Sequence, residues 1–372
     1  MKKIITLLLV CSVMLSCFGC GEKKTEEEKF VDAIAKGIEA RFELEKTNGS
    51  EEKLSKEEFL KQVNAEYESV KKFEETKFEN QDFSKWKKQY LQSLSDVNDI
   101  MELYDTNQWY AKYDNGIYYN RIEALYHINE IQKIPVTDAC KEQFESLLVL
   151  KTVDERFLDC LAKGLETRWA LTAEDEKKEA VTKKDWEEYI AAEYDNIIDF
   201  KDAKFENADL DKWGKEYVNS IVRSKEALAY FGSNQWDAKY HNGIYQDRAC
   251  ALYKINAIQP VPVSEEGQSS LQSLVMDGEV SDFASSILGS VKFEQESDDY
   301  GWKTYSTVVE NTTSTSFSYF SIAVDLLDKD GVTIETANAY CDWWDAGEKT
   351  RIEFSTDKNF ETMEPSYASW SF

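Results

Sequence analysis

Histidine and basic residues are scarce in this sequence. Only His127 and His241 occur among 372 residues, which excludes His-rich metal sites and leaves little material for His-based acid–base catalysis. Acidic residues outnumber basic ones by 71 to 44, so no basic stripe is available to neutralise nucleic-acid phosphates. Gly-rich phosphate loops, Gly-x-Ser-x-Gly elbows, HExxH motifs and EF-hand loops are also missing. We therefore expect no enzyme, no nucleic-acid partner, no metal and no cofactor.

Cysteine is sparse outside the N-terminus. Three of the seven cysteines lie in the first 20 residues, and the other four show no CxxC spacing. This pattern predicts neither a zinc site nor a dense disulfide framework. We expect buried free thiols rather than any one bridge, although the first two of the four are close enough in sequence to pair: Cys140, Cys160, Cys250 and Cys341.

The N-terminus, residues 1–20, has the pattern of a secretory signal. Two lysines precede an apolar run, Ile4 to Leu15, that is too short for a membrane span of about 20 residues. Gly19 and Cys20 then precede a polar tether at 21–28. This arrangement resembles the lipobox of bacterial lipoproteins, in which the Cys is acylated and becomes the new N-terminus. The resemblance implies lipid attachment at Cys20, or alternatively at Cys17, and an extracytoplasmic, membrane-anchored chain; an ordinary cleaved signal is the other interpretation.

Most of the chain is a tandem repeat. Residues 30–136 align with 157–263 at a constant offset of 127, without a gap, and 44 of the 107 aligned pairs are identical. A unit of this length indicates a duplicated domain rather than a short solenoid repeat. We predict one helical repeat at 29–150 and a second at 151–276.

Each repeat has the pattern of an antiparallel helical bundle. In the first helix, Phe30, Ile34, Ile38 and Phe42 recur at helical spacing. Capping boxes begin the next helix of each repeat, at 55–58 and 182–185. Pro135 and its copy at 262 prevent the fourth helix from continuing. The later helices of the first repeat are expected at about 82–103, 106–132 and 137–150.

Charged residues interrupt the apolar faces of two helices in each repeat. A buried carboxylate is costly unless it is paired and hydrogen-bonded, so we expect each buried Glu to meet an Arg. A polar pocket that recognises a charged ligand is the alternative. The predicted groups are Glu66 with Arg41 or Arg121, and Glu193 with Arg168 or Arg248.

An aromatic cluster recurs in both repeats beside Asn and Gln residues. Its helical spacing favours core filling, with Gly116 and Gly243 allowing close helix contact. An exposed platform for glycans or peptides is the alternative. The residues are Trp109, Tyr113 and Tyr118, with their copies Trp236, Tyr240 and Tyr245.

From about Asp277 the helical pattern gives way to alternation. A period of two runs through Phe320, Ile322, Val324 and Leu326, and is followed by a Lys-Asp-Gly hairpin turn at 329–331. Short strands with turn signals predict a β-sandwich over 277–372. This segment is also the most acidic, with 19 acidic residues against 6 basic ones.

The segment 285–360 resembles the FxLYD family of exported bacterial domains. Its hallmark falls on residues 324–328, Val-Asp-Leu-Leu-Asp, and Gly347-Glu348 precedes the last strands as in the family. The repeats, with Ala-Lys-Gly-Ile-Glu-Ala-Arg-Phe at 35–42, are similar to helical segments that accompany FxLYD domains in Firmicute lipoproteins. The resemblance implies an immunoglobulin-like sandwich at the cell surface, without catalysis and without a known ligand.

Together these patterns predict a multidomain α plus β protein. Two all-α helical-bundle repeats precede a C-terminal immunoglobulin-like β-sandwich. We expect a noncatalytic cell-surface lipoprotein that acts as an interaction or spacer module at the bacterial envelope. Its partners would be the membrane, through the N-terminal lipid, and an envelope protein, peptide or glycan. An extracytoplasmic solute- or glycan-binding lipoprotein is the alternative.

Overall fold

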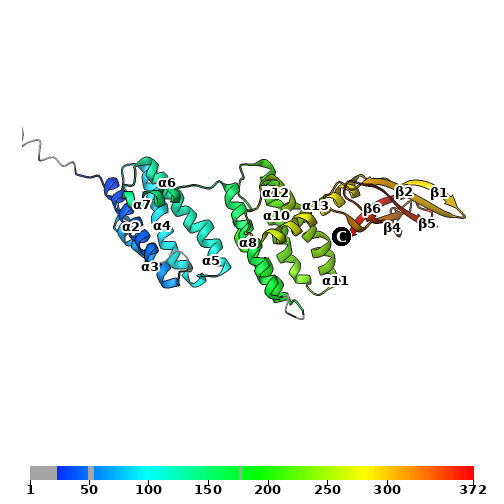
Figure 1. The fold of residues 1–372 in the computed structure, drawn as a ribbon, viewed down its shortest axis with the longest axis horizontal. Coiled ribbons are helices and arrows are strands. Elements are labelled where there is room, and N and C mark those ends of the chain that lie inside the picture. The colour runs from blue at the N-terminus through cyan, green and yellow to red at the C-terminus, as the bar shows by residue number, and fades with distance from the viewer. Residues whose placement is uncertain (1–22, 49–53, 176–177, 179) are drawn as a thin grey trace, which may run out of the picture. The chain divides into compact units, whose positions relative to one another are not determined.

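The computed structural model describes residues 23–48, 54–175, 178 and 180–372 (Figure 1). These residues form two compact units divided after Lys151, called unit 1 and unit 2 below. Unit 1 contains the first helical repeat, whereas unit 2 contains the second repeat and the C-terminal sheet. Within the described ranges, no helix combines the length and the apolar character needed to cross a membrane.

Unit 1 is all helical and encloses one core. Phe30 and Ile34 are completely buried there, as are Phe83 and Leu94. The elements, in chain order, are α2 (Glu26–Asn48), α3 (Lys56–Val70), η1 (Lys71–Phe73), α4 (Gln81–Ile100), η2 (Met101–Leu103), α5 (Asn107–Lys112), η3 (Tyr113–Tyr118), α6 (Tyr119–Ile131) and α7 (Asp138–Leu147).

Side-chain caps fix where these helices begin. Ser55 and Glu58 form the predicted capping box at α3, and Asn80 caps α4 by accepting from the Phe83 backbone N–H. The helix expected over 106–132 begins at the Thr106 cap but is not uniformly α-helical. Its middle, η3, is π-helical, so one helical path consists of α5, η3 and α6.

The helical part of unit 2 repeats this plan. The Thr182–Asp185 capping box begins α9, as predicted, and the π-helical segment recurs as η6. The elements are α8 (Val153–Asp175), α9 (Lys183–Ile197), η4 (Ile198–Phe200), α10 (Ala208–Ala227), η5 (Leu228–Tyr230), α11 (Asn234–Trp236), η6 (Asp237–Ile244), α12 (Tyr245–Ile258) and α13 (Gln268–Ser290).

Helix α13 corrects the expected end of the helical region at about Asp277. The helix continues to Ser290, because Val280, Phe283 and Ile287 keep a helical spacing and pack into the core of the sheet. At its centre a Cβ added to Gly278 would lie 2.0 Å from the Ala249 carbonyl oxygen, so α13 and α12 touch backbone to backbone. Helix α13 therefore belongs to the second helical repeat and to the sheet at once.

The glycines that bring helices together are not the predicted ones. A Cβ at Gly116 or Gly243 would meet nothing within 4 Å, so the expectation of close helix contact there was wrong. Gly37 takes that role in unit 1, because its Cβ would lie 2.9 Å from the Glu66 carbonyl oxygen. Gly164 is the matching close contact beside Glu193 in unit 2.

The C-terminal region is a six-stranded antiparallel sheet, so the chain combines α and β regions as expected. The strand order is β1-β2-β5-β4-β3-β6. The strands are β1 (Glu294–Asp299), β2 (Trp302–Glu310), β3 (Phe317–Leu327), β4 (Thr333–Trp344), β5 (Lys349–Thr356) and β6 (Thr362–Ser371).

The predicted alternation in β3 is present. Phe320, Ile322, Val324 and Leu326 are each 0% exposed and face a core shared with α13. The turn after β3 has Gly331 at φ +75°, a conformation that glycine adopts without strain. In the centre of the sheet β4 meets β5 through one register pair, Tyr340 with Glu353, so the ladder there is much shorter than its neighbours.

Candidate functional site

The charged residues predicted to meet in unit 1 form one buried cluster. Arg121 on α6 holds Glu66 on α3 with two parallel hydrogen bonds, Nε to Oε1 and Nη2 to Oε2, both 2.7 Å long. Arg41 on α2 donates to Oε2 at 3.2 Å, and the Tyr90 hydroxyl on α4 donates to Oε1 at 2.6 Å. The Glu66 side chain is 0% exposed, so four helices are joined at one carboxylate.

Electrostatics keep this carboxylate ionised. Burial alone would raise the pKa of Glu66, but the charges of Arg121 and Arg41 outweigh it and lower that pKa below the ordinary value. Tyr90 remains a neutral donor, because burial and the Glu66 charge raise its pKa well above the usual range.

The same cluster occurs in unit 2. Glu193 on α9 accepts from Arg168 on α8 and from the Tyr217 hydroxyl on α10, and Arg248 Nη1 on α12 lies 3.3 Å from its Oε1. Glu193 is also 0% exposed, and burial opposed by the two arginines again leaves its pKa lowered. Each candidate Glu therefore contacts both of its candidate arginines.

The two clusters differ in how the second arginine is balanced. Arg41 Nε also donates to Glu45 Oε1 at 3.2 Å. The position equivalent to Glu45 in unit 2 is Thr172. Arg168 donates to the Tyr240 hydroxyl at 3.4 Å, and Arg41 interacts in the same way with the equivalent Tyr113, so the Glu45 carboxylate is the difference between the units. Burial alone would raise the pKa of Tyr240, but Arg248 and Arg168 outweigh it and lower that pKa. Unit 2 thus buries two guanidinium groups against one carboxylate.

These clusters have the chemistry of structural ion pairs rather than of a catalytic site. The carboxylates are fully buried and their oxygens are occupied by arginine and tyrosine donors. A general acid or base must reach a substrate proton within hydrogen-bond distance, which a sealed carboxylate does not do. Two buried nitrogens in unit 1, Arg121 Nη1 and Gln62 Nε2, have no hydrogen-bond partner.

The aromatic cluster also lies mainly in the cores. Trp109 and Tyr113 are stacked with ring centres 4.8 Å apart and are 4% and 7% exposed. Their copies Trp236 and Tyr240 stack at 4.5 Å. The third member of each set, Tyr118 and Tyr245, is half-buried and packs against the same core, and Tyr245 donates to Asp277 Oδ2 at 2.6 Å. This geometry is that of core filling.

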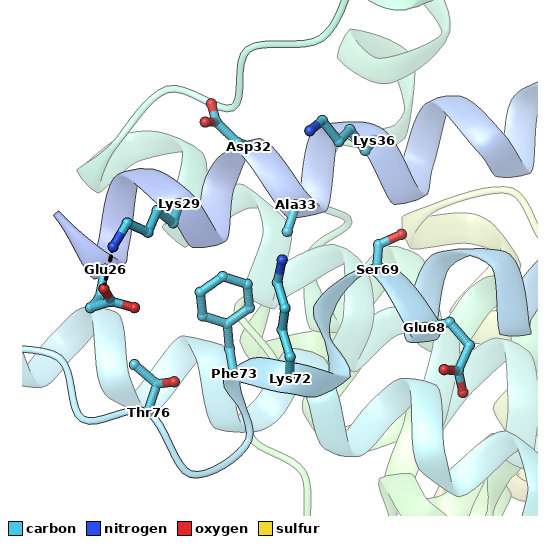
Figure 2. Close-up of a pocket in the computed structure, with 10 residues that line it drawn as sticks. All are labelled: Glu26, Lys29, Asp32, Ala33, Lys36, Glu68, Ser69, Lys72, Phe73 and Thr76. Atoms are coloured by element: carbon cyan, nitrogen blue, oxygen red, sulfur yellow. Dashed lines mark hydrogen bonds and ion pairs between the residues drawn. The ribbon is translucent and has the colours of Figure 1, made fainter. Parts of the chain in front are cut away.

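Three surface cavities lie elsewhere, and none of the three is lined by the predicted arginines, glutamates or tryptophans. One of about 620 Å³ lies between α2 and the end of α3 (Figure 2). Figure 2 shows Lys72 extending toward Ala33 beside the Phe73 ring, while Lys29 is paired with Glu26. In unit 2 the position of Lys72 is Asp199, so the two repeats do not share the charge of this cavity.

Lys87 is a buried residue that the sequence did not reveal. Its ammonium group donates to three backbone carbonyls at the end of η1 and in the turn that follows it, those of Phe73, Glu74 and Thr76, at 3.0, 3.0 and 2.8 Å. Burial lowers its pKa. The equivalent residue in unit 2 is Gly214, where a Cβ would lie 3.1 Å from the Phe205 ring.

The remaining candidates do not assemble into a reactive centre. None of the four described cysteines is in a disulfide, and burial raises the pKa of Cys250 and Cys341 to about 11, which disfavours the reactive thiolate. No metal-binding group of three or more His, Cys, Asp or Glu occurs in the described part of the chain. Cys17 and Cys20 lie outside the described residues. No family model, curated protein or solved structure matches the chain.

Proposed function

We propose that this protein is a noncatalytic, lipid-anchored surface protein whose helical repeats act as rigid spacer or interaction modules at the bacterial envelope. The N-terminal pattern that ends in Gly19-Cys20 supports export and acylation. Acyl chains contribute about 0.8 kcal/mol per buried methylene, so a diacylated cysteine is a stable anchor.

The observation that carries the proposal is the sealed charged cluster in each helical repeat. Glu66 and Glu193 each join four helices at a fully buried carboxylate. Breaking a buried ion pair is costly, so each bundle resists opening. A solute-binding protein would need these arginines and aromatics to line a cavity, whereas the glutamate-bound arginines and the two tryptophans are packed inside the bundles. Two stiff blocks in tandem suit the spacing or presentation of a terminal domain.

We also propose that the six strands form an immunoglobulin-like sandwich. The halves β1-β2-β5 and β4-β3-β6 meet through one register pair, and side chains from both halves share one core. Phe354 of β5 and Phe320 of β3 belong to that core. Two three-stranded layers packed on one another would account for this combination.

Mass spectrometry of the mature N-terminus tests the anchor. We expect the chain, expressed in a bacterium with a lipoprotein pathway, to begin at a diacylated Cys20 and to fractionate with membranes. Cys20→Ala should release it into the soluble fraction, and Cys140→Ala is the matched control that should not. An unmodified N-terminus at another residue would contradict the proposal, and modification at Cys17 would move the site.

A further inference from the structure

The outer face of β3, β4 and β6 exposes aromatic side chains. We call this surface the tyrosine face and define it by Tyr319, Tyr340 and Tyr367. Tyr340 and Tyr367 are 52% and 38% exposed, and the rings of Tyr319 and Tyr340 lie 6.1 Å apart at 28°. Large aromatic side chains exposed on a sheet face mark a surface suited to a partner.

Small residues form the floor between these rings. In the strand register Ser321 of β3 pairs with Tyr340 on one side and with Ser369 on the other. Ala323 pairs with Tyr367. These short side chains stand beside the tyrosines in the register, so they are the low positions of this face.

The charge of this surface selects its partner. Strands β3, β4 and β6 contain no Lys or Arg, whereas the outward side chains beside the tyrosines include Asp342, Glu353 and Glu364. In the described structure none of these three carboxylates forms an ion pair. By contrast, the cations of the other half of the sheet are already engaged: Arg351 with Glu296, Lys349 with Glu310, and Lys303 with the Asn359 side chain. The tyrosine face is thus aromatic, acidic and without cations of its own.

Trp343, next to Asp342 on β4, is a further exposed aromatic residue and has an unusual backbone conformation. It is 81% exposed and has φ +54°, which is unfavourable for a bulky residue. This conformation interrupts the alternation, so that Asp342 and Trp343 are both exposed before the buried Trp344. A strained backbone that keeps a tryptophan in water has no packing benefit within the fold.

We propose that the tyrosine face docks an extended segment of another protein that is rich in lysine. Tyrosine rings attract ammonium groups, and carboxylates at the edge pair with them. The aliphatic stems of lysine would cover the floor of Ser321 and Ala323. This inference does not depend on the lipid anchor, since a chain without the anchor retains the face.

Titration of the full chain with a fluorescently labelled peptide of alternating lysine and serine tests the proposal. We expect binding that weakens with salt and is absent for a glutamate–serine peptide. Tyr340→Ala, which leaves the net charge unchanged, should lower the affinity about fivefold. Tyr300→Ala is the matched control, because Tyr300 is an exposed tyrosine of the same domain at the β1–β2 turn, and it should leave the affinity unchanged.

A second variant separates recognition from folding. Trp343→Gly should lower the affinity while leaving the thermal midpoint unchanged or higher, because glycine adopts φ +54° without strain. Tyr300→Gly, at φ +56°, should have the same effect on stability and no effect on binding. Equal affinity in Tyr340→Ala and the parent would overturn the proposal, since attraction by diffuse negative charge would then suffice. Tyr340-dependent binding of a neutral chitin oligosaccharide without peptide binding would also overturn it.

Discussion

The two helical repeats keep the same buried Arg–Glu–Tyr–Arg cluster but balance its charge differently. In unit 1 the second arginine, Arg41, reaches Glu45 at the edge of the bundle. In unit 2 Thr172 replaces that carboxylate, and Arg168 retains only the tyrosine contact, with Tyr240, that Arg41 also has with Tyr113. The comparison separates two parts of the arrangement. The central carboxylate is required to join the helices, whereas the outer partner of the second arginine is adjustable.

The largest effect should come from neutralising the central carboxylate. Glu193→Gln leaves two buried guanidinium groups without a counter-charge and should cost about 4 kcal/mol of unfolding free energy. Glu66→Gln should cost less, because Glu45 still neutralises Arg41. Urea unfolding of the whole chain, monitored by amide hydrogen exchange that is resolved into peptides from each unit, would measure both losses of stability. Glu188→Gln and Glu68→Gln, exposed on the same helices, are the controls; full stability in both core variants would refute the buried-pair interpretation.

Disrupting the backbone contact between α13 and α12 should have the second largest effect. Gly278→Ala places a Cβ against the Ala249 carbonyl, so α13 must shift and unit 2 should lose about 3 kcal/mol. Gly116→Ala in unit 1 meets open space and should leave stability unchanged or slightly raised. Thermal unfolding of both variants, with near-ultraviolet circular dichroism of the sheet tryptophans, would test this contrast. If Gly278→Ala left the free energy of unfolding unchanged, the close contact of α13 with α12 would not contribute to the stability of unit 2.

Removing the Lys87 ammonium group should have the third largest effect. Lys87→Met removes the donor to three carbonyls and should destabilise unit 1 by about 2 kcal/mol, since the carbonyls lose their partner. Hydrogen exchange over residues 71–80 should accelerate, and the Gly214 region of unit 2 should not change. Lys88→Met, an exposed neighbour, is the control. If both variants behave alike, the three carbonyls do not need the ammonium group.

Lowering the pH should reduce the free energy of unfolding of both units. Glu66 and Glu193 have lowered pKa values in the folded state, so the unfolded chain binds more protons as the pH falls below the ordinary glutamate pKa of about 4.3. Their contribution is therefore complete above that pH and is lost as the pH falls through the folded pKa values. Urea midpoints measured from pH 7 to pH 3 should decrease in the parent. The decrease should be smaller in the double variant Glu66→Gln, Glu193→Gln.

The smallest effect tests the difference between the repeats directly. Thr172→Glu gives unit 2 the carboxylate that Glu45 supplies in unit 1 and should stabilise it by about 0.5 kcal/mol. The pKa of Tyr240 should rise, because the added negative charge offsets the two arginines that lower it. Ultraviolet titration of tyrosine would detect this, with Glu45→Thr as the converse variant. An unchanged Tyr240 titration would show that residue 172 does not reach Arg168.

Local patterns predicted the helices and the central ion clusters well. Glu66 was identifiable because it interrupts an apolar stripe, and β3 because four apolar residues alternate. Tyr90 could not be recognised as the fourth member, since a tyrosine on an apolar face is indistinguishable from core. Lys87 was missed because lysine normally lies at the surface. The helical end of α13 was missed because its apolar residues Val280, Phe283 and Ile287 are buried by the sheet that follows, so only the folded sheet shows which face of this segment is buried.

The features that the two repeats share indicate what was present before the duplication. The ion cluster and the π-helical segments η3 and η6 occur at equivalent positions in both units, so they were present in the ancestral single-copy domain. Lys87 and Glu45 each occur in one unit only, so each was gained or lost after the duplication. Helix α7 of unit 1 stands where α13 begins in unit 2, and the part of α13 beyond that equivalent, with Val280, Phe283 and Ile287, is what attaches the sheet to the second repeat.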